Sequence, residues 1–138
     1  MKVVGDMKSL RMTKDEYYLN IAKAVSKRST CLKRQYGAVI VKNDEIIATG
    51  YNGNPRGMDN CVDFGFCNRL HKPHNSGDYS DCHSVHAEQN AMLSASRKDM
   101  IGSKMYLYGE ENGNEILAEP CPICHRMIIN AGIKEIVS

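Results

Sequence analysis

The stretch "GAVIVKNDEIIATG", residues Gly37–Gly50, decides the fold expected for this chain. It consists of two short runs rich in β-branched residues, and the runs flank the dipeptide Asn43-Asp44. Branched side chains favour strands, and a polar pair between two such runs is typical of a tight turn. The stretch therefore predicts a β-hairpin.

Helices and further strands are expected on both sides of this hairpin. Upstream, "TKDE" is a capping-box pattern, and the apolar residues after it recur at helical spacing, which predicts a helix over about 13–28. The other expected elements are a helix from about Val85, a strand over Lys104–Gly109, a helix from Pro122 to just before Gly132, and a final strand in "IKEIVS". This order predicts an α/β fold, with helices covering a mixed sheet.

The composition is that of an ordinary globular protein, and we expect one domain over residues 1–138. Hydrophobic residues make up 42% and charged residues 25% of the chain, with a net charge of +2. Charges of both signs are mixed along the chain, which argues against binding to duplex nucleic acid. With no run of 18 apolar residues and no secretory pattern at the N-terminus, we expect a cytoplasmic protein without a membrane segment.

Two segments are expected to be irregular. Residues 50–79 are rich in Gly, Asn, Asp, Pro and Cys and show no periodicity, so they predict a long loop. A loop of this length in a compact domain is usually functional or tied down by something. The segment "EENGNEILAE", Glu110–Glu119, predicts a polar loop or a small hairpin with Asn-Gly at its tip.

Two short motifs begin the second and third expected helices. In "SVHAEQNAM", His86 and Glu88 are two positions apart, and "EPCPICHRM" contains Cys121-x-x-Cys124. Two thiolates and one imidazole can bind a zinc ion and leave a fourth position open, which is the catalytic type of zinc site. Such an ion lowers the pKa of a bound water. Glu88 lies on the same helical turn as His86, so it can accept and donate the protons of that water.

Each motif alone has a simpler explanation. His86 alone fits a partly buried histidine, and the cysteine pair alone fits a redox pair or a structural zinc knuckle. Together, with a helix start at each, they favour a catalytic zinc site. A histidine and a glutamate in this spacing, followed by Pro-Cys-x-x-Cys, is the signature of zinc-dependent deaminases.

Four stretches carry a resemblance to a known family: "HAEQNAM", "GYNGNP", "RSTCLKRQYGAVIV" and "IINAGIKEIV". Together they are similar to the cytidine and deoxycytidylate deaminases over most of Thr13–Val137. Asn90 and the "GYNG" loop favour the deoxycytidylate branch. The chain departs from the family in "GEENGNEILAE", which is longer than the usual passage from the strand to Pro-Cys.

The resemblance implies a three-layer α/β/α sandwich with a mixed sheet, as in cytidine deaminase. It implies hydrolytic removal of the cytosine amine from dCMP, which gives dUMP and ammonia and supplies precursors of dTTP. It also implies homo-oligomers, commonly hexamers, that are switched on by dCTP and off by dTTP with Mg²⁺.

The resemblance also assigns residues around the reacting base. It implies that His86, Cys121 and Cys124 hold the catalytic zinc and that Glu88 shuttles protons. It further implies that Ala87, between the ligand and the proton acceptor, belongs to the substrate site.

For the rest of the nucleotide, the resemblance implies that Asn52 binds the sugar or phosphate. It implies phosphate contacts somewhere in the segment formed by Lys27, Arg28, Ser29 and Thr30. Without the resemblance, Asn52 would be a turn residue in an Asn-Gly pair, and the basic pair would be a solvated helix end favoured by the helix dipole.

Six cysteines in a cytoplasmic chain are expected to be metal ligands, reactive groups or core residues rather than disulfides. Some members of the deoxycytidylate branch carry a second, structural zinc. The matching ligands here are Cys31 and Cys61, and the further donors available are Cys67, Cys82 and His83. Such an ion would explain how the long loop stays folded. The alternative is that these cysteines are free buried thiols.

Other functions remain open from the sequence. The substrate could be dCTP, and a tRNA adenosine deaminase or a deaminase of small bases shares the zinc motif. The near-neutral charge and the "GYNG" loop argue against RNA. A purely structural zinc module is the non-enzymatic alternative, and Glu88 argues against it because such a site needs four ligands and no base.

Overall fold

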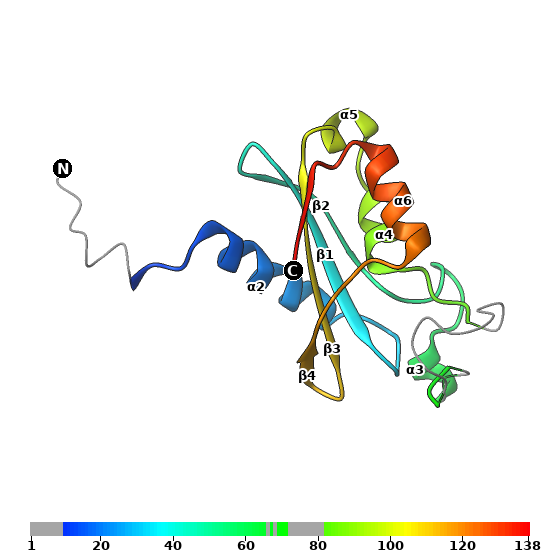
Figure 1. Ribbon diagram of the computed structural model, residues 1–138. Helices are drawn as coiled ribbons and strands as arrows, with labels where there is room; N and C mark the ends of the chain where they lie inside the picture. The colour runs from blue at the N-terminus through cyan, green and yellow to red at the C-terminus, as the bar shows by residue number, and fades with distance from the viewer. Residues whose placement is uncertain (1–9, 66, 68, 72–81) are drawn as a thin grey trace.

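The computed structural model describes residues 10–65, 67, 69–71 and 82–138, and within them a five-stranded mixed sheet carries helices on both faces (Figure 1). In chain order the elements are α2 (Lys14–Ser26), β1 (Gln35–Lys42), β2 (Glu45–Tyr51), α3 (Cys61–Phe64), α4 (Ala87–Leu93), α5 (Arg97–Met100), β3 (Lys104–Glu111), β4 (Asn114–Ile116), α6 (Pro122–Ala131) and β5 (Glu135–Val137). Helix α2 covers one face of the sheet, and α4 and α6 cover the other (Figure 1). The expected three-layer α/β/α architecture is confirmed.

Strand β3 is the centre of the sheet. It pairs with β1 in antiparallel fashion from Lys104 to Glu110, and β1 pairs with β2 on its other side. Because β1 occupies that whole edge of β3, strands β4 and β5 share the opposite edge. Strand β5 runs parallel to the beginning of β3, and β4 returns antiparallel to its end. The single parallel pair makes the sheet mixed.

Both hairpins turn at residues with left-handed backbone conformations. Asn43 and Asp44 have φ angles of 52° and 62° between β1 and β2, and a pair of positive φ angles is what a tight two-residue hairpin requires. The predicted hairpin over residues 37–50 is confirmed. Asn112 and Gly113 turn the second hairpin, with φ angles of 53° and 79°. Strand β3 therefore continues past Gly109 to Glu111.

Alternate residues of the central strands supply two separate cores. Ala38 and Ile40 of β1 pack under α4 and α6, whereas Val39 and Val41 pack under α2. The same alternation continues on β3, where Met105 and Leu107 join the first core. Side chains of a strand point to opposite faces in turn, so a strand covered on both sides is apolar throughout.

Helix α2 begins as expected, with the Thr13 side chain accepting a hydrogen bond from the Glu16 amide at 3.1 Å. It ends at Ser26, two residues earlier than predicted. The amides of Lys27 and Arg28 bond to carbonyls only three residues back, so the last turn tightens before the chain leaves the helix.

The second predicted helix starts later than the sequence indicated. Val85 forms an isolated antiparallel bridge with Gly53, with N–H···O distances of 2.7 and 3.1 Å. These two bonds hold Val85 in an extended conformation, so α4 begins at Ala87 with His86 as its N-cap. The short helices α3 and α5 were not predicted, and α3 lies within residues 50–79, which were expected to be a loop. Residues 66, 68 and 72–79 of that expected loop lie outside the described residues. The third helix is confirmed from Pro122 to Ala131, with Gly132 (φ 86°) as its C-cap.

In the part of the chain that the structure describes, no helix combines the length and the apolar character that a bilayer crossing requires.

Gly50 lets α4 lie directly against β2. A Cβ atom at this position would lie 2.3 Å from the Ala91 nitrogen and 2.5 Å from the Ala87 oxygen, both backbone atoms of α4. We expect Gly50→Ala to lower the free energy of unfolding by about 1–3 kcal/mol, the usual cost of overpacking, as measured by urea denaturation. The matched control is Thr49→Val, at an exposed neighbouring position, which should stay within about 0.5 kcal/mol of wild type. Equal stability of Gly50→Ala and wild type would show that α4 can shift away at no cost.

Candidate metal centre

The N-termini of α4 and α6 meet on one face of the sheet (Figure 1). Each has a potential metal ligand at its N-cap position, His86 on α4 and Cys121 on α6. His86 caps α4, and its backbone amide donates to Gln89 Oε1 at 2.9 Å. Cys121 caps α6, and its sulfur accepts a hydrogen bond from the Cys124 amide at 3.4 Å. The Cys-x-x-Cys spacing places Cys124 on the first turn of α6. Each cap therefore fixes one ligand at the junction of the two helices.

The three predicted zinc ligands converge. His86 Nδ1 lies 3.2 Å from Cys124 Sγ and 3.6 Å from Cys121 Sγ. Among the described residues, this is the one group in which three or more metal-binding atoms all lie within 4.8 Å of one another. Tetrahedral ligands on zinc–sulfur bonds of about 2.3 Å and zinc–nitrogen bonds of about 2.0 Å lie roughly 3.5–3.8 Å apart. The spacing and the donor atoms thus fit zinc.

Glu88 lies beside these ligands and is only 5% exposed. Burial raises the pKa of the Glu88 carboxyl, and hydrogen bonds from the backbone and from the Cys124 thiol only partly offset this. Burial also raises the pKa of the Cys124 thiol, and the charge of Glu88 adds to the effect. Two buried acidic groups in contact do not both ionise unless a cation is close. A zinc ion on the two sulfurs would supply that cation.

The His86 imidazole is suited to coordination for a similar reason. Burial lowers the pKa of His86 below its ordinary value, which favours the neutral ring. A neutral imidazole has the free lone pair that a metal requires. Ala87, the next residue, is completely buried at the start of α4 and separates the ligand from Glu88 along the chain.

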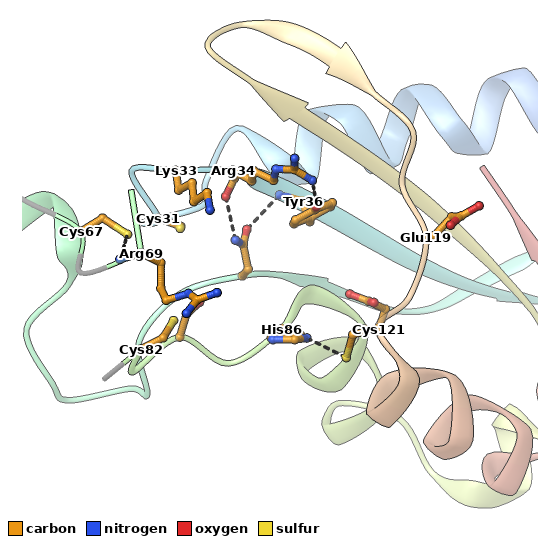
Figure 2. Close-up of a pocket in the computed structure, with 13 residues that line it drawn as sticks. Cys31, Lys33, Arg34, Tyr36, Cys67, Arg69, Cys82, His86, Glu119 and Cys121 are labelled. Atoms are coloured by element: carbon orange, nitrogen blue, oxygen red, sulfur yellow. Dashed lines mark hydrogen bonds between the residues drawn. The ribbon is translucent and has the colours of Figure 1, made fainter. Parts of the chain in front are cut away.

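The metal centre opens into a cavity between the start of β1, the end of β2 and the two helix N-termini (Figure 2). His86, Glu88 and Cys121 line it at one end. Three basic side chains that the sequence reasoning had not singled out also line it: Lys33, Arg34 and Arg69. The basic pair in "CLKRQYG" was an available signal, because it directly precedes the strand that leads into the site.

Asn52 forms part of the wall of this cavity. Its Oδ1 accepts hydrogen bonds from Ser29 Oγ at 2.7 Å and from the Tyr36 amide at 2.9 Å, and its Nδ2 donates to the Arg34 carbonyl at 2.8 Å. Asn52 is 6% exposed. It therefore joins the end of β2 to the chain before β1, which is more than a turn residue does. Its contact with a substrate stays a prediction.

The four residues predicted to contact phosphate, 27–30, do not share one site. Lys27 Nζ pairs with the buried Glu110 carboxylate at 2.7 and 2.8 Å, and Ser29 bonds to both oxygens of Asn52. Arg28 and Thr30 line a second pocket with Arg56 and Asn90. Within the described residues, neither Lys27 nor Arg28 lines the cavity of the metal centre. Ser29 and Thr30 do not line that cavity either, but both bond to Asn52, which does.

All six cysteines are free thiols, and the four outside the metal centre are neighbours. Cys31, Cys67 and Cys82 line the same cavity. Burial raises the pKa of the Cys61 thiol, and the other three thiols add to this rise because they lie near it. His83 is exposed. No three of these four sulfurs all lie within 4.8 Å of one another, and a second zinc stays a prediction.

Comparisons with known proteins agree with the site. The family model described as "Cytidine and deoxycytidylate deaminase zinc-binding region" matches residues 12–138. The deoxycytidylate deaminase of Schizosaccharomyces pombe is 40% identical over 124 residues, covering 89% of this chain and 36% of that protein. The enzyme of Saccharomyces cerevisiae is 39% identical over 131 residues, covering 93% and 38%. This chain thus spans little more than a third of the two yeast relatives.

A phage relative is matched over most of its length. The deoxycytidylate deaminase of Mycobacterium phage D29 is 39% identical over 129 residues, covering 89% of this chain and 91% of the relative. Among solved structures, the dCMP deaminase from the cyanophage S-TIM5 in complex with dCMP and dUMP is similar with a TM-score of 0.63 and 29% identity. That match covers 91% of this chain and 82% of the other.

Proposed function

Because the chain belongs to the family of cytidine and deoxycytidylate deaminases, we propose that it catalyses the zinc-dependent hydrolysis of dCMP to dUMP and ammonia. The observation that carries the proposal is the buried Glu88 beside three converging zinc ligands in one cavity. A structural zinc site needs a fourth protein ligand and no proton acceptor. A hydrolytic site needs three ligands and a base, and this chain provides both.

In the proposed reaction, water adds its oxygen to C4 of cytosine and the bond from C4 to the amine breaks. When bound, zinc supplies Lewis-acid activation of that water. Glu88 accepts the proton that the attacking water gives up and passes a proton to the departing amine. The raised pKa of the Glu88 carboxyl suits this exchange, because a group that both accepts and donates protons works best with a pKa nearer neutral.

An ammonia-release assay tests the substrate. The purified protein is given dCMP, dCTP, deoxycytidine, cytosine and guanine separately, and then dCMP together with each competitor. We expect the highest kcat/KM with dCMP, which is the ligand of the S-TIM5 relative. A preference for dCTP would support the proposed deamination but would make dCTP, not dCMP, the substrate. Equal turnover of deoxycytidine and dCMP, or activity on a free base alone, would contradict the proposal.

We also propose a second, structural zinc held by Cys31, Cys61 and two further donors from among Cys67, Cys82 and His83. The closeness of the four thiols supports it, and the exposure of His83 favours the cysteines. Because a preformed site is absent from the unfolded chain, binding such an ion stabilises the fold.

Metal analysis is expected to find two zinc ions per chain in the wild-type protein. Cys31→Ser and Cys61→Ser should each leave one ion and lower the midpoint of thermal unfolding, because binding of the ion stabilises the folded chain. The matched control is His71→Ala, at an exposed loop position, which should retain both ions. One zinc per wild-type chain, with both serine variants fully stable, would make these cysteines ordinary buried thiols.

We further propose a cytoplasmic homo-oligomer, a hexamer by analogy with the family, regulated by dCTP and by dTTP with Mg²⁺. Six free thiols are in keeping with a reducing compartment. Light scattering measures the oligomer. Initial rates at low dCMP concentration, with and without each effector, measure the regulation.

A further inference from the structure

We propose that Tyr36 and Gly109 form a steric pair that determines which base the cavity of the metal centre admits, with the Tyr36 ring as the surface against which the base lies. The inference rests on the proposed function, because it presumes that a nucleobase enters the cavity. Zinc-dependent deaminases act on cytosine or on adenine, and the shape of the pocket contributes to the choice between them. A bulky side chain opposite the zinc ligands is therefore well placed to make this choice.

Tyr36 lies across the cavity from the metal ligands. Figure 2 shows it on the side of the sheet, whereas His86 and Cys121 lie at the starts of the two helices. Burial raises the pKa of the Tyr36 phenol, hydrogen bonding and charge from Arg34 partly offset this, and the charge of Glu88 adds to the rise. The carboxylate of Glu88 thus acts on the phenol across the cavity. A base that reacts beside Glu88 would have the Tyr36 ring on its other side.

Gly109 is what allows the Tyr36 ring to lie close to the sheet. The two residues are direct partners in the pairing of β1 with β3. A Cβ atom on Gly109 would lie 2.6 Å from Cε1 and 2.7 Å from Cδ1 of the Tyr36 ring. Residues directly opposite on neighbouring strands point their side chains to the same face of the sheet. A methyl group on Gly109 would therefore lift the ring off the sheet and toward the metal ligands, into the space that a base needs.

The Tyr36 side chain and backbone are also fixed by hydrogen bonds. Arg34 Nη1 donates to the Tyr36 hydroxyl at 3.3 Å, and Arg34 Nε pairs with Glu111 at 3.4 Å. The Tyr36 amide donates to Asn52 Oδ1 at 2.9 Å. The ring is thus held at its hydroxyl end and at its backbone. A surface fixed in this way loses little conformational freedom when a base packs against it, which favours binding.

An aromatic ring over a glycine on the next strand can also serve the sheet alone, by covering exposed backbone. The Tyr36 ring does more than this, because it is only half-buried and lines the cavity of the metal centre. A ring with a purely structural task would affect the stability of the protein and leave its KM unchanged.

Steady-state kinetics with dCMP test the role of the ring. Tyr36→Ala should raise KM about 5- to 100-fold, the usual effect of losing an aromatic surface for a base. The change should lie in KM rather than kcat, because packing against the base is the same in the ground state and the transition state. Tyr36→Phe, which keeps the ring, should recover most of the affinity lost in Tyr36→Ala. The matched control is Tyr17→Ala, at an exposed position on α2, which should have wild-type kinetics.

A double-mutant cycle tests the steric contact itself. Gly109→Ala should raise KM for dCMP about 5- to 100-fold, which corresponds to the usual cost of overpacking, because it pushes the ring into the cavity. In the Tyr36→Ala background the same substitution should have no further effect, since no ring is left to displace. The zinc content and the unfolding midpoint of each variant show whether the protein is intact.

Inhibition by dAMP tests the choice of base. Removal of the Tyr36 ring opens space beside the base, and a purine needs such space for its second ring. In Tyr36→Ala, we expect the inhibition constant of dAMP, relative to the KM of dCMP, to fall about 10-fold or more. This measurement needs no substitution at Gly109, so it tests the inference even if Gly109→Ala does not fold.

The outcomes separate this inference from the proposed function. If wild type does not deaminate dCMP, the proposed function itself fails. If wild type is active and Tyr36→Ala keeps its KM for dCMP, the ring is not a binding surface and the inference is wrong. Additive effects of the two substitutions would mean that Gly109 acts independently of Tyr36, which contradicts a steric pair. Unchanged relative inhibition by dAMP would overturn the role in the choice of base.

Discussion

Glu88→Gln is expected to lower kcat for dCMP by about 10²- to 10⁴-fold, the usual contribution of general acid–base catalysis. Glutamine has the shape of glutamate but cannot accept the proton of the attacking water. Glu88 is buried at the start of α4 and is not among the three converging ligands. The zinc content of the variant should therefore equal that of wild type, as measured by metal analysis.

A matched control for this variant is Glu115→Gln, which makes the same change at an exposed position on β4. It should retain wild-type kcat and zinc. The assignment of Glu88 would be refuted by near-normal turnover in Glu88→Gln with zinc bound. Loss of zinc together with activity would instead make Glu88 part of the metal site.

Cys124→Ser is expected to remove both the catalytic zinc and all measurable deamination. The Cys124 sulfur lies 3.2 Å from His86 Nδ1 and is completely buried. A serine hydroxyl does not provide the thiolate that zinc binds. Changes in groups that merely support metal ligands weaken metal affinity about 10–100-fold, so losing a ligand should weaken it by more. Metal analysis should show one zinc fewer per chain than in wild type.

The control for Cys124→Ser is His125→Ala. His125 is the next residue on α6, but it is exposed, so its loss should change neither zinc content nor kcat. The imidazole of His125 could bind zinc, and only its exposed position on α6 excludes it from the ligand set. If Cys124→Ser kept its zinc while His125→Ala lost it, α6 would be rotated relative to the site described, and the ligand set would be wrong.

The sequence by itself determined the features that depend on neighbours along the chain. Asn43 and Asp44 predict the first hairpin because the turn needs two residues that tolerate a positive φ. Thr13 and Gly132 predict helix ends because they satisfy backbone groups within their own turn. The metal centre was also predictable, although its halves are 35 residues apart. A zinc site accepts only a few types of residue as ligands. Within each half, the functional residues are separated by a fixed number of positions.

Only the tertiary structure decided features that depend on contacts between distant segments. The bridge from Val85 to Gly53 delays the start of α4, and no local pattern encodes that pairing. Lys27 looks like an unpaired surface cation in the sequence, but it forms an ion pair with the buried carboxylate of Glu110, 83 residues later. Arg69 looks like an ordinary loop residue, but the fold buries it in the wall of the cavity beside the metal centre. A charged side chain can serve as a surface group, an ion-pair partner or a ligand contact. Which of these it becomes depends on the groups that the folded chain brings within a few ångströms.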